Sequence, residues 1–160
     1  MTVNIRNFTK FKINSNLILK IVGAILTQEK KPTADLSLVV VGSKKMTSLN
    51  YKFRKINQPT DVLAFAEKDI TLKFPSLDGT FYLGEIIICP EVIGAQAKEY
   101  GVSVSLELTR IIIHGILHLL GYDHEKSFLI AKKMLQKENE IVTKLFRDES
   151  LDFCASLTKS

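Results

Sequence analysis

The chain has 160 residues, of which 46% are hydrophobic and 24% are charged, and its formal net charge is +5. This length and composition suit one folded domain over residues 1–160 and exclude a disordered chain or a fibrous repeat. Two cysteines, Cys89 and Cys154, are too few for a disulfide framework. Met1–Arg6 lacks the pattern of a secretory leader, and the apolar segment Leu17–Leu26 is too short to span a bilayer. We therefore expect a cytoplasmic protein that does not enter a membrane.

The hydrophobic pattern predicts nine elements in the order β, α, β, α, β, β, α, α, α. In chain order they are a strand at Val3–Phe8, a helix from Asn14–Asn16 to about Glu29, a strand at Leu36–Val41, a helix at Ser43–Phe53, strands at Asp61–Phe65 and Phe81–Cys89, and helices at Pro90–Gly101, Leu106–Leu120 and about Glu125–Phe146. Loops are expected at Arg54–Thr60 and Lys73–Gly79, and a frayed tail from about residue 147. This order predicts an α+β fold, with a small mixed sheet of about four strands packed against about five helices.

The segment Leu106–Leu120 is apolar on nearly every side, which is typical of a buried helix. Ser103 or Ser105 can cap its start. Gly121 is a natural stop, because glycine adopts the left-handed conformation that often ends a helix. The sequence therefore predicts a central helix with a sharp exit.

All three histidines of the chain, His114, His118 and His124, lie within eleven residues at the end of this helix. His114 and His118 are four residues apart, so they lie on one helix face, about 40° apart around the axis. A chain that folds back after Gly121 can bring His124 to the same point. Three imidazoles predict a divalent metal site whose fourth position is open to water, and zinc is the preferred ion. Asp123 is a candidate for orienting one of the histidines, and the alternative is that it fills the fourth position of the metal.

The residue after the first histidine is Gly115, whereas metallopeptidases with an HExxH motif carry a glutamate general base there. A peptidase of that type would lack its proton acceptor. We also expect the glycine to leave room beside the metal for a bulky group. These two points favour a phosphodiester over a peptide as substrate.

Basic residues gather before the third predicted strand. Between Lys44 and Thr60 there are five basic residues and no acid, which suits a phosphate ligand, although a solvated helix face has the same pattern. Arg54 is the candidate phosphate clamp, because a guanidinium can bind a phosphate with two hydrogen bonds. On the residues alone, a surface ion pair is the preferred role for Arg54. Asp61 is expected to cap the loop.

The segment HGILHLLGYDH, His114–His124, resembles the signature of the YbeY family of bacterial rRNA maturation factors. Three further segments, Leu49–Arg54, Pro59–Phe65 and Leu83–Ile88, resemble the arginine segment, the PTDVLSF strand and the LGDI strand of that family. Ala64 stands where the family usually has Ser, and Glu85 where it usually has Asp.

This resemblance implies a topology like that of metallopeptidase catalytic domains, with the metal helix at the centre. It implies a metal-dependent endoribonuclease, specific for single strands, that acts in 16S rRNA maturation and ribosome quality control. Its partners would be RNA, the ribosome and ribosome-associated proteins, and not DNA. The resemblance also makes Arg54 and Glu85 the candidate catalytic residues, with Glu85 orienting a water or a histidine.

Two other functions remain open on the residues alone. The first is an RNA-binding ribosome assembly factor that cuts nothing and whose metal is structural. The second is a hydrolase of some small phosphoester or amide. Removal of the metal would unfold the assembly factor but leave a nuclease folded and inactive, and a panel of substrates would reveal the other hydrolase.

Overall fold

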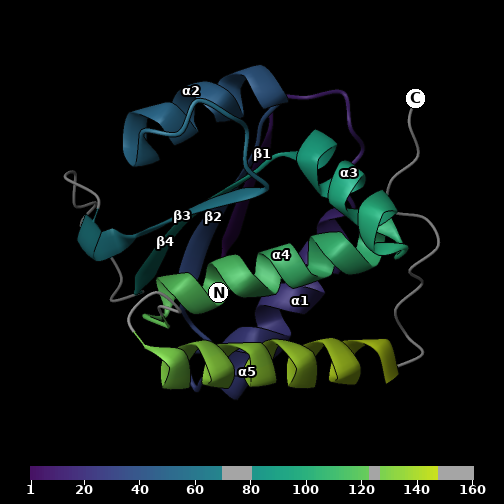
Figure 1. Ribbon diagram of the computed structural model, residues 1–160. Coiled ribbons are helices and arrows are strands. Elements are labelled where there is room, and N and C mark those ends of the chain that lie inside the picture. Colours follow the sequence, from purple (N-terminus) through teal and green to yellow (C-terminus); the bar gives the residue numbers. More distant parts are fainter. Residues whose placement is uncertain (70–80, 123–126, 148–160) are drawn as a thin grey trace.

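The computed structural model describes residues 1–69, 81–122 and 127–147, and within these ranges the chain forms five α helices and four strands (Figure 1). In chain order they are β1 (Val3–Asn7), α1 (Ser15–Gln28), β2 (Asp35–Val40), α2 (Ser43–Arg54), β3 (Val62–Ala66), β4 (Tyr82–Ile88), α3 (Pro90–Tyr100), α4 (Val104–Leu119) and α5 (Phe128–Arg147). A short 3-10 helix, Glu67–Asp69, follows β3 and was not predicted. The predicted order of strands and helices is confirmed.

The four strands form one mixed sheet in the order β1-β2-β4-β3. Strands β1, β2 and β4 are parallel, and β3 runs antiparallel to β4 at one edge. Helix α1 connects the parallel strands β1 and β2. Helices α3, α4 and α5 all follow β4, and no further strand comes after them in the described residues. The predicted α+β class is therefore confirmed.

Helices cover the two faces of the sheet unequally (Figure 1). Helices α1, α4 and α5 share a large core with the residues of one sheet face, including Leu36, Leu38 and Ile86. On the other face, Met46 of α2 joins a smaller cluster with Val39, Leu63, Ile87 and Cys89. The predicted buried helix, α4, thus lies between the sheet and the outer helix α5.

An irregularity in β4 changes which side chains face α4. Tyr82 pairs with Asp35 and Gly84 with Leu36, so one residue of β4 is left over as a bulge. Gly84 has φ +142°, and a Cβ there would lie 2.2 Å from the carbonyl oxygen of Phe65. Only glycine fits this position, and beyond it the alternation of the strand is shifted by one residue.

Side chains and turns fix the ends of the helices. The side chain of Ser103 accepts a hydrogen bond from the backbone N–H of Leu106 at 3.2 Å, so Ser103 rather than Ser105 caps α4. At the other end, the N–H of Gly121 donates to the carbonyl of His118 at 2.9 Å and that of Tyr122 to the carbonyl of Leu117 at 3.0 Å. With φ +95° at Gly121, this is the Schellman arrangement, and the predicted stop is confirmed.

Several predictions from sequence lie outside the described residues. They concern His124, Asp123, the start of the last helix at Glu125, the loop Lys73–Gly79, Cys154 and the tail after residue 147. Among the described residues no single helix combines the length and apolar character needed to cross a bilayer, and α3 and α4 reach them only together, across a bend of 117°.

Candidate metal and phosphate site

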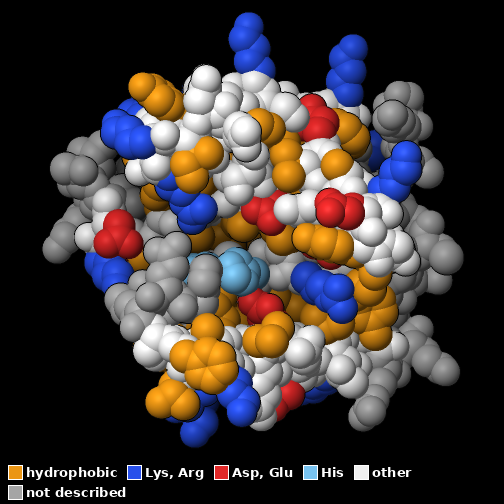
Figure 2. Space-filling model, in the orientation of Figure 1, with side chains coloured by type: hydrophobic (Ala, Val, Ile, Leu, Met, Phe, Trp, Pro, Cys, Tyr) orange, Lys and Arg blue, Asp and Glu red, His pale blue; other side chains and the backbone are white. Residues whose placement is uncertain are grey.

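Helix α4 presents a row of side chains to a cavity of about 640 Å³. Glu107, Ile111, His114 and His118 recur at helical spacing along this row, because residues three and four apart share a helix face. The opposite walls of the cavity come from α2, β3, α3 and α5. Figure 2 shows histidine side chains at the bottom of a hollow, with acidic and basic side chains around it.

The two described histidines point at each other. Their Nε2 atoms lie 3.0 Å apart, and their ring centroids lie 4.6 Å apart at an interplanar angle of 72°. Two nitrogens bound tetrahedrally to one zinc ion at about 2.0–2.1 Å would lie roughly 3.3 Å apart. The donor set and the spacing of the pair therefore fit a shared divalent ion.

Glu138 of α5 contacts the outer nitrogen of the first histidine. Its Oε1 lies 2.6 Å from Nδ1 of His114. A proton on Nδ1 that is donated to this carboxylate leaves the Nε2 lone pair of His114 directed into the cavity. Glu138 is thus placed to fix both the tautomer and the orientation of His114.

The sequence analysis missed Glu138, although a signal was present. Met134, Ile141 and Leu145 form the buried stripe of α5, and Glu138 falls within this stripe at helical spacing. A carboxylate on the apolar face of an amphipathic helix needs a partner, which His114 provides.

The predicted third ligand, His124, lies outside the described residues. Among residues 1–69, 81–122 and 127–147, no group of three His, Cys, Asp or Glu side chains surrounds a common point. The structure therefore brings two of the three predicted ligands together, and the part of His124 stays a prediction.

Arg54, the candidate phosphate clamp, lines the same cavity as His114 and His118. It is the last residue of α2, and Lys55 ends the helix in a left-handed conformation with φ +63°. Arg54 is exposed at this helix end and lines the cavity together with both described histidines. The structure thus brings Arg54 and the histidines together, as the sequence predicts.

Glu85 lies on the other face of the sheet. It pairs with Ser37 of β2 and Phe65 of β3, and Phe65 packs against Phe53 of α2 with ring centroids 4.7 Å apart. Its neighbour Ile86 faces α4 instead. The structure does not bring Glu85 to the histidines, and we assign it no part in the site.

Gly115 does not open a space toward the sheet. A Cβ at this position would lie 3.2 Å from both the Cδ1 and Cγ2 atoms of Ile86, and 3.4 Å from Cγ2 of Val62. The expectation that the glycine leaves room for a bulky group is wrong on this side. The missing side chain instead lets α4 lie close to β3 and β4.

Asp61 has the structural role that the sequence suggests. Its Oδ1 accepts hydrogen bonds from the N–H of Val62 at 2.7 Å and from the hydroxyl of Thr60 at 3.0 Å. Its Oδ2 accepts one from Nε2 of Gln96 at 3.2 Å. The same carboxylate lines the cavity and adds to its negative charge.

The profile of the family described as endoribonuclease YbeY matches residues 4–146. The chain belongs to this family. A relative from Thermodesulfovibrio yellowstonii named endoribonuclease YbeY is 46% identical over 110 residues, which are 69% of this chain and 66% of the relative. One of the same name from Chloroflexus aurantiacus is 38% identical over 81% of this chain and 86% of its own. The solution structure of TM1509 from Thermotoga maritima superposes with a TM-score of 0.62 at 28% identity, covering 91% of this chain and 90% of that one.

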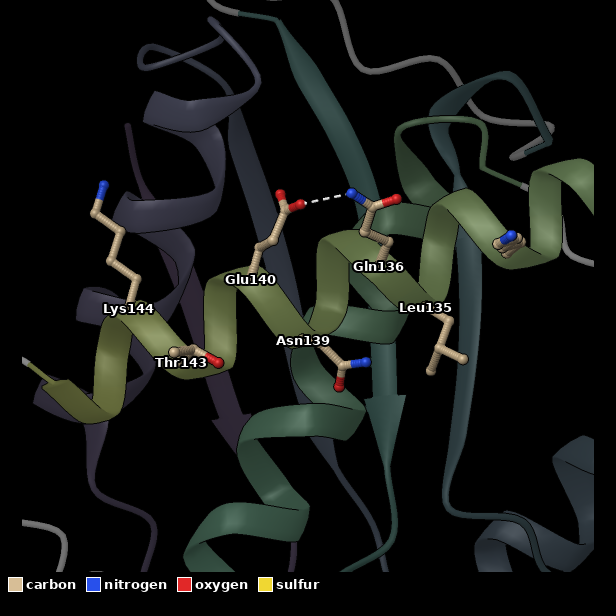
Figure 3. Close-up of a pocket in the computed structure, with 7 residues that line it drawn as sticks. Leu135, Gln136, Asn139, Glu140, Thr143 and Lys144 are labelled. Carbon is tan, nitrogen blue, oxygen red and sulfur yellow. Dashed lines mark hydrogen bonds between the residues drawn. The ribbon is translucent and has the colours of Figure 1, made fainter.

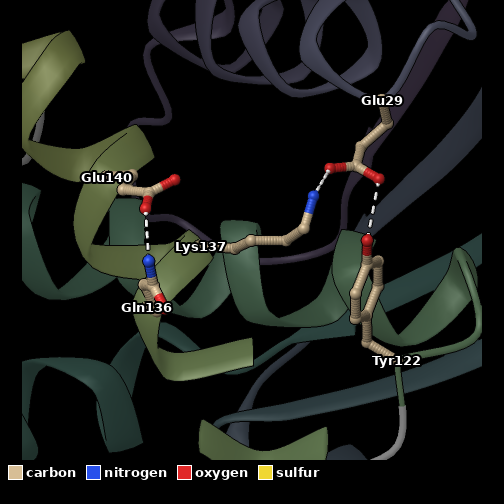
Figure 4. A network of polar contacts seen from close by, with 5 residues as sticks. All are labelled: Glu29, Tyr122, Gln136, Lys137 and Glu140. Carbon is tan, nitrogen blue, oxygen red and sulfur yellow. Dashed lines mark hydrogen bonds and ion pairs between the residues drawn. The ribbon is translucent and has the colours of Figure 1, made fainter. Parts of the chain in front are cut away.

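A polar network beside the site ties three helices together (Figure 4). The hydroxyl of Tyr122, just after α4, donates to Oε2 of Glu29 at 3.1 Å, and Nζ of Lys137 donates to Oε1 of the same carboxylate. The hydrogen bond to Glu29 raises the pKa of Lys137. Because Lys137 precedes Glu138, this network fixes the rotation of α5 that brings Glu138 to His114.

Glu107 is buried in the cavity wall, and one of its two carboxylate oxygens has no hydrogen-bond partner among the described residues. Its side chain is only 5% exposed, and the oxygen without a partner is Oε2. Burial raises the pKa of this carboxyl, Arg110 opposes the shift, and Asp61 adds to it. The sequence analysis did not single out Glu107.

A second hollow, of about 810 Å³, runs along the outer side of α5 (Figure 3). Its described lining residues all belong to that helix, including Leu135, Asn139 and Lys144. Gln136 donates to Glu140 at 2.9 Å, a pair typical of a solvent-facing helix. None of the described lining residues is a histidine, and Leu135 also lines the cavity of the site on α4.

Proposed function

We propose that this chain is a metal-dependent endoribonuclease that cuts single-stranded RNA and acts in 16S rRNA maturation and ribosome quality control in the cytoplasm. The observation that carries the proposal is the pair of Nε2 atoms 3.0 Å apart in the cavity that Arg54 also lines. Membership of the endoribonuclease YbeY family, and relatives that bear this name, support RNA as the substrate.

The ion is held by His114, His118 and His124, and zinc is the preferred metal. The spacing of the first two and the carboxylate behind His114 support this assignment. When bound, a divalent ion supplies a Lewis acid for a phosphoryl oxygen and lowers the pKa of water.

The residues of the chain position the RNA for this chemistry. The Arg54 guanidinium binds the scissile phosphate and offsets the negative charge that develops on it. Glu138 holds the His114 ring and its proton at Nδ1. Both side chains act by orienting other groups rather than by transferring a proton. Neither role therefore requires the glutamate general base that HExxH peptidases carry at the position of Gly115.

The surface of α2 supports a single strand rather than a duplex. Tyr51 and Phe53 are about half exposed, at 55% and 51%, and each lies beneath a lysine. Nζ of Lys55 lies 5.9 Å from the Tyr51 ring centroid and that of Lys52 lies 5.3 Å from the Phe53 ring centroid. Unpaired bases stack on such rings while lysines attract the phosphates, which is how non-duplex RNA is bound.

The test is RNA cleavage by the wild type, His114→Ala and Arg54→Glu, with Lys98→Glu as a matched charge reversal on the exposed side of α3. We expect both site variants to lose activity and Lys98→Glu to keep it. Equal cleavage by all four proteins would point to a contaminating nuclease and defeat the proposal.

Thermal melts with and without a chelator separate the nuclease from an assembly factor with a structural metal. An assembly factor with a structural metal would unfold when the ion is removed, whereas the enzyme would stay folded and inactive. A panel of small phosphoesters and amides would expose a different hydrolase. Elemental analysis of the purified protein gives the metal and its stoichiometry.

A further inference from the structure

The burial of Glu107 lowers the stability of the folded protein, and this carboxylate has no part in the proposed binding of the metal or the phosphate. A buried carboxylate oxygen without a partner lowers the stability of the fold, so a carboxylate kept in a cavity wall is a candidate acceptor for a ligand that donates a hydrogen bond. The carboxylate lines the same cavity as the histidines.

The neighbours of Glu107 limit what that ligand can be. Tyr100, at the end of α3, lines the same cavity and is 59% exposed, so its ring offers a flat surface to a planar group. Asp61 is a second acceptor in the same wall, and its own hydrogen bonds with Thr60, Val62 and Gln96 hold it in place. The wall therefore combines an aromatic ring for stacking with carboxylate acceptors. It favours a planar ligand that donates hydrogen bonds.

The distance along α4 suits one nucleotide. Glu107 and His114 are seven residues apart, which is roughly 10 Å along the helix axis. This is comparable to the reach of a nucleotide from its phosphate to the edge of its base. With a phosphate at Arg54 and the histidines, the neighbouring base falls beside Tyr100 and Glu107.

We propose that Glu107 and Tyr100 form a nucleobase subsite, in which the base stacks on Tyr100 and donates its exocyclic amino group to the Glu107 carboxylate. This rests on the proposed function for the placement of the phosphate. Cytosine, adenine and guanine each carry an exocyclic amino donor. Uracil has no amino group, and its N3–H donor lies between two carbonyl oxygens that the carboxylate repels. The subsite thus favours amino-bearing bases over uracil next to the cleaved bond.

The sharpest comparison uses cytosine against uracil, because these bases have the same ring size and differ at the amino group. Short single-stranded RNAs that differ at one base beside the cleavage site are cut by the wild type, and the binding of CMP and UMP is measured separately. We expect about a tenfold preference for cytosine in both assays, as for one good base contact. Equal rates and equal affinities for both bases would overturn the proposal.

Glu107→Gln tests the acceptor directly, because the amide offers a donor as well as an acceptor at nearly the same size. We expect the cytosine preference to fall to about twofold or less, while Glu99→Gln, an exposed change on α3, keeps it. Tyr100→Leu should weaken both nucleotides and leave their ratio unchanged. This second variant keeps the proposal testable if Glu107→Gln fails to fold.

The two proposals fail in different ways. An absence of cleavage on any RNA counts against the nuclease, and the CMP and UMP affinities still test the subsite. Cleavage without any base preference counts against the subsite alone. Equal nucleotide affinities together with Mg²⁺ binding that depends on Glu107 would assign the carboxylate to a cation and overturn the nucleobase proposal.

Discussion

Each face of the sheet has a carboxylate beside it, Glu138 on the α4 side and Glu85 on the α2 side. The two faces differ in the groups that the neighbouring helices bring close to that carboxylate. On the α4 face, His114, His118 and Glu138 converge, and Arg54 reaches their cavity from the end of α2. On the α2 face, Glu85 lies near Tyr82, whose hydroxyl donates to Ser37 at 3.0 Å. Both faces hold a carboxylate near a hydrogen-bonding group. Among the described residues, Glu138 of the α4 face lines the cavity that holds the histidines, whereas Glu85 does not. The chemistry of this fold therefore depends on the face to which a side chain is directed.

The largest expected effect comes from comparing His114→Ala on the α4 face with Glu85→Gln on the α2 face. We expect His114→Ala to reduce RNA cleavage by about 100-fold or more, because it removes a ligand of an ion worth several kcal/mol to the reaction. Glu85→Gln should change the rate by less than about twofold. Initial rates on one single-stranded RNA, with circular dichroism to confirm the fold, give both numbers. A large loss in Glu85→Gln would mean that the two faces act together.

Glu138→Gln should have a smaller effect on the α4 site than His114→Ala, because it leaves both described histidines in place. The amide keeps the size of the side chain but weakens the hydrogen bond that orients His114, so metal affinity should fall about 10- to 100-fold. Competition with a chromophoric chelator measures this affinity without any RNA. Glu140→Gln is the matched control, because it lies on the same helix and contacts only Gln136 among the contacts shown in Figure 4. Equal affinities in the two variants would remove Glu138 from the site.

The sequence predicted the order of elements and the pairing of His114 with His118, because both follow from local periodicity. The helix stop at Gly121 and the cap at Ser103 are equally local, since each is decided within a few residues. Arg54 is the last residue of α2, the helix that connects β2 to β3. Its position near the start of β3 therefore follows from the order of the elements.

What could not be predicted depends on tertiary structure. The alternation of a regular strand would put Glu85 on the face of Leu83, which belongs to the core beneath α4. The bulge at Gly84 reverses this, and it is set by the close approach of the Phe65 carbonyl rather than by any local pattern. The position of Glu138 on the apolar face of α5 could be seen in the sequence, but its partner His114, 24 residues away on another helix, could not.

The network around Glu29 holds α5 against the α4 face, and Glu29→Gln should loosen it. The change leaves Lys137 without its ion-pair partner and weakens the hydrogen bond of Tyr122. For this partly buried pair we expect a loss of about 2 kcal/mol in the free energy of unfolding, or a melting temperature lower by about 4–8 °C. Urea unfolding of the wild type, Glu29→Gln, Lys137→Met and the double variant isolates the pair. Additive losses would show that the two side chains do not interact.

The smallest effect concerns Glu107, whose burial should make it a stability cost that depends on pH. Because its pKa is raised above the ordinary value of 4.5, the folded state holds the proton more tightly than the unfolded state, and stability falls as pH rises through this range. Glu107→Gln removes this contribution. We expect similar melting temperatures at pH 4 and a variant more stable by about 1 kcal/mol, or about 2–4 °C, at pH 7. Glu99→Gln controls for the loss of an acidic charge on the surface. A Glu107→Gln variant that is less stable than the wild type at pH 7 would mean that the folded protein already stabilises the carboxylate, which would weaken the case for a ligand there.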